Sequence, residues 1–112
     1  MSRRFIVAML GLGLALFLIP QVSLAVEDHI PQAITHTKQA IAHGKQGHAD
    51  VLAIHAETAL THAEAGEQAK PNAHTEEAIE HLKQAIDEGK KGNAEEATKH
   101  AEAALTSLGQ AR

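Results

Sequence analysis

Hydrophobic residues recur every three or four positions along two stretches in the first half of the chain, the spacing of amphipathic helices. We expect one helix that is capped by Asp28 and stopped by Gly44, and a second from about His48 to Ala65. The buried face of the first comprises Ile30, Ala33, Ile34, Thr37, Ala40 and Ile41. The buried face of the second comprises Ala49, Leu52, Ala56, Ala59, Leu60 and Ala63.

The second half of the chain carries the same pattern. A linker over residues 66–72, which includes a proline, leads to Asn72 as the N-cap of a third helix. The buried face of this helix comprises Ala78, Ile79, Leu82, Ala85 and Ile86. Asn93 and Glu96 have the spacing of a capping box for a fourth helix, which we expect to end near Gly109.

The two halves are similar in sequence. An offset of 45 residues places residues 29–62 on residues 74–107 with 18 of 34 positions identical, and a Gly-x-x-Gly turn at 44–47 recurs at 89–92. A single helical hairpin cannot bury its apolar stripe alone. The sequence therefore predicts an all-α fold, an antiparallel up-down-up-down four-helix bundle made of two duplicated hairpins. A two-helix hairpin that dimerises into four helices is the alternative.

The N-terminal segment has the three parts of a secretory signal peptide: Arg3 and Arg4, an apolar run over residues 5–19, and a small-residue cleavage site at residues 23–25. We therefore predict a signal peptide at residues 1–25, a mature bundle domain at residues 26–112, and a periplasmic location without membrane attachment after cleavage. An uncleaved membrane anchor is the alternative, although the apolar run is shorter than the roughly 20 residues of a spanning helix.

Removal of residues 1–25 changes the composition of what remains. Both phenylalanines, both methionines and two arginines leave, so the formal net charge moves from −4 to −6, and the chain has no cysteine. A negative net charge argues against a nucleic-acid partner. The core is restricted to Ile, Leu, Val and Ala, without any disulfide, and the small domain should be only marginally stable unless a metal contributes.

Histidine is the residue type that suggests chemistry. Nine histidines occur in the chain, and six of them form two columns with seven-residue spacing, mirrored about the turn at 44–47. In an antiparallel hairpin these six lie level in three pairs, here called rungs: His29 with His62, His36 with His55, and His43 with His48. Neighbouring histidines of one column are roughly 10.5 Å apart along the helix, too far to share an ion, so a second ligand must come from the opposite helix.

The second hairpin has fewer such pairs. Its level positions pair His81 with His100, His74 with Ser107, and Glu88 with Asn93. Glu77 and Glu96 lie within one helical turn of a histidine and are candidate carboxylate ligands.

The helical phase allows the two columns of the first hairpin either to face each other or to point away from each other. A solvated histidine stripe that binds nothing is the simplest alternative.

The ligand type favours particular metals. Imidazole with carboxylate and water, without thiolate or thioether, suits Cu(II), Ni(II) or Zn(II), and divalent affinity usually peaks at copper. We expect several open sites of moderate affinity. An enzyme is not expected, because the diiron motif Glu-x-x-His and the motif His-Glu-x-x-His are both absent from the sequence. Neither a Cys-x-x-Cys-His motif nor, in the mature chain, an axial methionine is present for haem.

These motifs carry a family resemblance. The His-Gly-Lys-Gln-Gly-His turn at residues 43–48 and the related His-Ala-Glu segments within 52–57 and 97–102 resemble the small metal-binding protein family, histidine-rich periplasmic proteins of bacteria. The resemblance covers essentially all of the mature chain. It implies a monomeric four-helix bundle like cytochrome b562 without haem, which binds several divalent ions with copper foremost.

The resemblance also implies ligands. The heptad histidines of the family correspond to His29, His36, His43, His48, His55, His62, His74, His81 and His100, and the chain departs from the pattern at Glu88, Asn93 and Ser107. The sequence thus predicts a periplasmic protein that buffers or sequesters divalent transition metals. A metallochaperone that delivers copper to a partner, or a helical protein-interaction module without metal, are the alternatives.

Overall fold

The structure is a computed structural model that describes residues 28–112. Within this range the chain forms four helices, α2 (His29–Lys45), α3 (Ala49–Ala69), α4 (Ala73–Lys90) and α5 (Ala94–Gln110). The predicted signal peptide and its cleavage site lie outside the described residues. No helix between residues 28 and 112 combines the length and the apolar character needed to cross a membrane.

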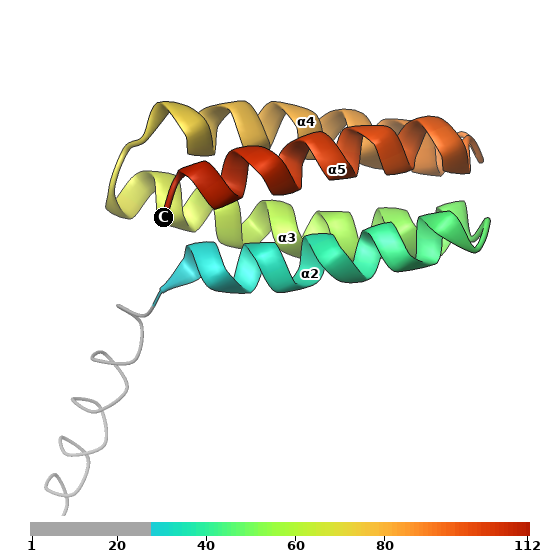
Figure 1. Cartoon of the computed structure of the whole chain (residues 1–112), viewed down its shortest axis with the longest axis horizontal. Coiled ribbons are helices and arrows are strands. Elements are labelled where there is room, and N and C mark those ends of the chain that lie inside the picture. The colour runs from blue at the N-terminus through green and yellow to red at the C-terminus, as the bar shows by residue number, and fades with distance from the viewer. Residues whose placement is uncertain (1–27) are drawn as a thin grey trace, which may run out of the picture.

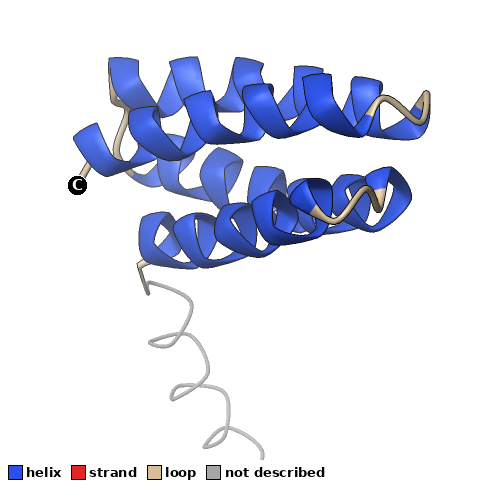
Figure 2. Cartoon of the chain, turned by 45° about the vertical axis from the view of Figure 1, so that its right-hand side comes forward, coloured by secondary structure: helices blue, strands red, loops and turns tan. Residues whose placement is uncertain are grey.

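The four helices pack as a bundle in which each lies mainly against two others. α2 and α3 form one hairpin and α4 and α5 the other, and the sides are closed by α3 against α4 and α2 against α5 (Figure 1). Both hairpin turns lie at one end of the bundle, and the linker between α3 and α4 lies at the other (Figure 2). The predicted all-α four-helix bundle is confirmed.

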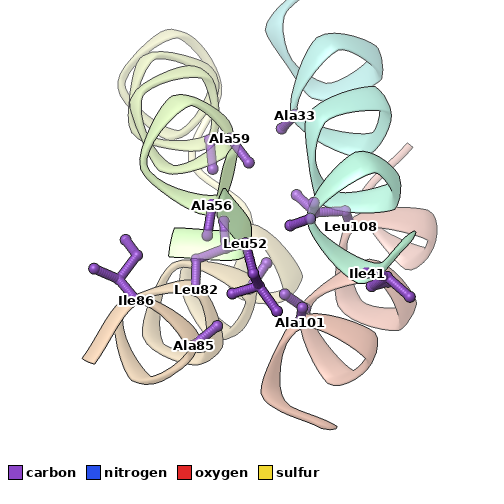
Figure 3. Close-up of a cluster of buried hydrophobic side chains, with 14 of the residues drawn as sticks. Ala33, Ile41, Leu52, Ala56, Ala59, Leu82, Ala85, Ile86, Ala101 and Leu108 are labelled. Atoms are coloured by element: carbon purple, nitrogen blue, oxygen red, sulfur yellow. The ribbon is translucent and has the colours of Figure 1, made fainter. Parts of the chain in front are cut away.

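The core is built mainly from alanine. Within residues 28–112, twelve of the eighteen buried hydrophobic residues are alanine, and the rest are three leucines and three isoleucines. Figure 3 shows Leu52, Leu82 and Leu108 filling the space between helices that approach each other at alanines. The predicted buried faces are correct for the most part, except that Ile30, Leu60 and Ile79 are only partly buried at the edge of the core. Small side chains let the helix backbones approach closely, but each removes little apolar area from water.

The first turn begins later than predicted. Gly44 does not stop α2 but lies buried inside it, and the helix continues to Lys45. The residue with positive φ is Gly47, at 86°, and the second hairpin repeats this with Gly92 at the same angle. The left-handed conformation that ends each hairpin turn is thus supplied by the second glycine of the Gly-x-x-Gly motif. The first glycine has a packing role instead.

The predicted end of α3 is wrong as well. The helix does not stop at Ala65 but continues through Gly66 to Ala69, so the linker is only Lys70 to Asn72. Alanine, glutamate and glutamine in this stretch favour helix, and they outweigh the single glycine. The helix ends where Lys70, which precedes a proline, adopts an extended conformation with φ −151° and ψ 93°.

The helix caps follow the prediction at one of three positions. Asn72 caps α4, since its side-chain oxygen accepts a hydrogen bond from the backbone N–H of His74 at 2.8 Å. Asp28 and Asn93 occupy N-cap positions without making a side-chain cap bond. The predicted capping box at Asn93 is wrong because the Asn93 amide donates instead to Glu88 Oε1 at 2.7 Å.

Two interhelical contacts occur twice at positions 45 residues apart. The Lys45 ammonium lies 3.7 Å from Glu102, which joins α2 to α5, and the Lys90 ammonium lies 3.1 Å from Glu57, which joins α4 to α3. Gly44 packs against Thr98, and Gly89 packs against Ala53 at the equivalent place. The two hairpins therefore meet through equivalent contacts on both sides of the bundle.

Gly44 provides a test of this close approach. A Cβ at Gly44 would overlap with the side chains of Thr98 and Leu52, so Gly44→Ala should lower the free energy of unfolding by about 1–3 kcal/mol. The melting temperature should fall by roughly 4–8 °C per kcal/mol in a domain of this size. Gly109→Ala is the control, because an added Cβ there meets no atom within 4 Å beyond its chain neighbours and the local backbone of its own helix, and the melting temperature of this variant should stay the same or rise slightly. A Gly44→Ala protein as stable as the Gly109→Ala protein would contradict the packing described here.

Candidate metal centre

The two histidine columns of the first hairpin face each other across the seam between α2 and α3. The ring centroids of the three predicted rungs are 5.5 Å apart for His29 and His62, 6.3 Å for His36 and His55, and 6.3 Å for His43 and His48. The geometry that the sequence left open is thus the facing one. We call these six residues the histidine ladder.

The ladder also contains diagonal pairs, which the sequence analysis missed. His36 lies 5.7 Å from His62, and His43 lies 5.1 Å from His55, so both diagonals are shorter than the rungs His36/His55 and His43/His48. The cause is the tilt of helical side chains toward the N-terminus of their own helix. In antiparallel helices the tilts are opposite, which brings His36 toward His62 and His43 toward His55. The direction of this tilt is the signal that would have revealed the diagonals.

All five separations suit a shared ion. An imidazole nitrogen binds such a metal at about 2.0–2.1 Å, so two rings on one ion have centroids roughly 4.5–6.3 Å apart for N–metal–N angles between about 90° and 180°. The observed separations of 5.1 to 6.3 Å fall within that range. By centroid separation, each of the five pairs is therefore a candidate for bridging one ion.

Four ring nitrogens show how ligands are presented. The Nδ1 atoms of His29 and His62 are 3.2 Å apart, a separation at which one proton or one metal ion can be held between them. Nδ1 of His36 lies 3.1 Å from Oε1 of Gln39, and when it donates there, Nε2 keeps the free lone pair. Nδ1 of His43 is buried and has no hydrogen-bond partner. Such a nitrogen is costly to leave unpaired, and a bound ion would satisfy it.

Gln39 is a residue of the site that the sequence pattern did not single out. It stands three residues after His36 on the same helical face, where it can orient the imidazole as second-sphere groups do in metal sites. The spacing of three residues between a histidine and an amide side chain is the signal that would have found it.

The ladder occupies the boundary between core and solvent. His48 is exposed, and the other five members are partly buried. Burial lowers the pKa of His55, with smaller contributions from the nearby imidazoles of His43 and His36. The pKa of His62 is lowered for the same reasons, burial first and then His29 and His36. Both shifts favour the neutral imidazole, which is the form that binds metal.

The second hairpin retains one histidine pair. His81 and His100 have ring centroids 6.3 Å apart, and Nδ1 of His81 is buried without a hydrogen-bond partner. At the level that corresponds to His43 and His48, Glu88 and Asn93 are joined by a hydrogen bond. This hydrogen bond takes the place of a metal-binding rung.

His74, which the sequence places level with Ser107, is exposed. Glu77 lies between them, since its Oε1 accepts a hydrogen bond from the Ser107 hydroxyl at 3.2 Å and lies 4.0 Å from Nδ1 of His74. Glu77 is thus in place as a neighbour of one histidine. The other candidate carboxylate, Glu96, forms an ion pair with Lys99 at 3.6 Å.

The described part of the chain contains no group of three or more His, Cys, Asp or Glu side chains placed to hold one ion. Each candidate site in residues 28–112 is therefore a pair of imidazoles, with coordination positions left for water. Such open, two-ligand sites bind more weakly than a closed structural centre with four protein ligands.

The lowered pKa values predict how acid affects the metal-free fold. Below the unfolded-state pKa of about 6.5, the unfolded chain binds more protons than the folded chain at His55 and His62. The free energy of unfolding therefore decreases as the pH decreases. Stability from these groups is fully present above about pH 7 and is lost as the pH falls below the unfolded-state pKa of about 6.5. In chelator, the melting temperature should therefore drop across this range, and it should drop less in the double variant His55→Gln/His62→Gln.

His74→Gln is the control for this measurement, because its ring lies outside the ladder, and it should show the same drop as the parent protein. An equal drop in melting temperature with pH in the double variant and in the control would show that burial of the ladder imidazoles does not contribute to the pH dependence of stability.

Comparison with known proteins adds family evidence to this geometry. Residues 4–111 match the family model described as small metal-binding protein. No curated protein matches the chain significantly. The family match supports metal binding over a helical module that binds no metal, and it covers nearly the whole chain. The chain therefore belongs to the small metal-binding protein family.

Proposed function

We propose that this protein buffers or sequesters several divalent transition-metal ions, each held by two imidazoles from neighbouring helices. The observation that carries the proposal is the histidine ladder, in which six imidazoles along one seam lie at separations that suit shared ions. The pair His81/His100 adds a further site in the second hairpin. Both members of each pair come from one chain, which supports a monomer as the working unit.

The favoured ion is Cu(II), with Ni(II) and Zn(II) as weaker alternatives. The ladder offers imidazole nitrogen, and the described residues contain neither cysteine nor methionine that would favour Cu(I). Affinity of nitrogen sites for divalent ions rises through nickel to copper and is lower again for zinc. Protons compete with metal near the ordinary histidine pKa of about 6.5, so we expect loading at neutral pH and release in acid.

We propose a periplasmic location and a role without catalysis. Export is supported by the composition of residues 1–25, which resembles a secretory signal peptide. A binding role is supported by the placement of the histidines along a helix seam rather than around a cavity. A cavity of about 440 Å³ between α2 and α5 is lined by Gly44, Lys45, Gly47, Ala94, Glu95, Thr98, Lys99 and Glu102 and includes no histidine.

The test compares two triple variants that each remove three histidines. His36→Ala/His43→Ala/His55→Ala leaves only the pair His29/His62 in the ladder, so two of its three ions should be lost. His74→Ala/His81→Ala/His100→Ala should lose the one ion of the second hairpin and any weak binding at His74. The measurement is the number of Cu(II) ions bound per chain at neutral pH, by calorimetric titration and by metal analysis after desalting.

Equal losses in the two variants would contradict binding at paired histidines. A parent protein that takes up no copper, nickel or zinc at micromolar concentration would reject the proposed function itself.

A further inference from the structure

The ladder differs from a set of separate rungs because its inner members are shared. His36, His43, His55 and His62 each lie beside two other ladder histidines, so the rings form one unbroken series. The order along this series is His29, His62, His36, His55, His43, His48. Five neighbouring pairs therefore exist where the rungs alone number three.

We propose that the ladder binds metal in interchangeable pairs, so that an ion held by a rung can pass to a diagonal by exchanging one imidazole while it keeps the other. This inference rests on the proposed function and specifies how its main site is loaded. The diagonals at 5.1 and 5.7 Å are comparable with the rungs, whose centroid separations run from 5.5 to 6.3 Å, so geometry does not favour the rungs over the diagonals. The incoming imidazole displaces one water bound at an open position, and a water molecule then takes the position of the outgoing imidazole, which becomes free for a second ion.

Sharing makes affinity depend on load. A single ion has five alternative pairs along the series, whereas three ions fit in one arrangement only, with each rung occupied. The third ion must therefore bind more weakly than the first, even if all pairs have the same intrinsic affinity. The ladder would hold its first ion firmly and release its last one readily, which suits a buffer that must both store and give up metal.

The second hairpin lacks this property. His81 and His100 form a pair whose neighbouring levels are occupied by Glu88 with Asn93 and by Glu77 with Ser107. An ion there has no second histidine pair to move to among the contacts of the described residues. The pair thus serves as a fixed site against which the ladder can be compared within the same molecule.

Double variants separate shared pairs from fixed rungs. His29→Ala/His48→Ala removes both ends of the series and leaves His62, His36, His55 and His43, which form two diagonals but only one rung. Shared pairing predicts that this variant loses one Cu(II) ion relative to the parent chain. Fixed rungs predict that it loses two.

Two further double variants calibrate the count. His29→Ala/His62→Ala removes one whole rung and should lose one ion under either arrangement. His36→Ala/His43→Ala leaves His29/His62 as the last neighbouring pair and should lose two ions under either arrangement. All three variants remove two imidazoles, retain His81 and His100, and can be checked for unchanged helix content by circular dichroism.

The experiment is a Cu(II) titration of the parent and the three variants at neutral pH. The inference is supported if His29→Ala/His48→Ala retains as many ions as His29→Ala/His62→Ala. It is overturned if this variant retains only as many as His36→Ala/His43→Ala, in which case the proposed function still stands with fixed rungs. A parent chain that binds no Cu(II) would overturn both the inference and the proposed function.

Discussion

The facing of two histidine columns across the α2 and α3 seam is the constraint on which the rest of the site depends. A seven-residue spacing keeps each column on one side of its helix, and the tight turn sets the register so that His43 and His48 are level. Opposite side-chain tilts then bring His36 toward His62 and close the gaps between rungs. One backbone arrangement thus converts six separate imidazoles into a continuous series of ligand pairs.

The composition of the core fits this arrangement. Alanines and the buried glycines Gly44 and Gly89 let neighbouring helices approach closely. The same small side chains bury little apolar area, so the metal-free bundle gains little stability from its core. The partly buried, uncharged imidazoles of His55 and His62 add a dependence on pH. An ion that bridges α2 and α3 would therefore act on a fold that has little stability in reserve.

Helical periodicity was sufficient to predict the four helices, most of the buried faces and the three rungs, because each follows from residue spacing alone. Helix ends were harder to predict. Gly44 and Gly66 are classed as helix breakers by type, but both lie inside helices, where they are close to the side chains of Thr98 and Ile30. The diagonals and the partners of the carboxylates required three-dimensional detail. The tilt of the side chains determines which histidines form the diagonals, and the ion pair with Lys99 determines where the Glu96 carboxylate lies.

The most direct test of the central claim, that ions bridge α2 and α3, is the melting temperature in excess Cu(II) compared with chelator. An ion that binds only the folded state adds about 2.7 kcal/mol per site at a hundredfold excess over Kd. For a domain of this size 1 kcal/mol corresponds to roughly 4–8 °C, so the melting temperature should rise by about ten degrees or more. An unchanged melting temperature in a protein that demonstrably binds copper would contradict the claim, because it would mean that the histidines bind as independent surface ligands.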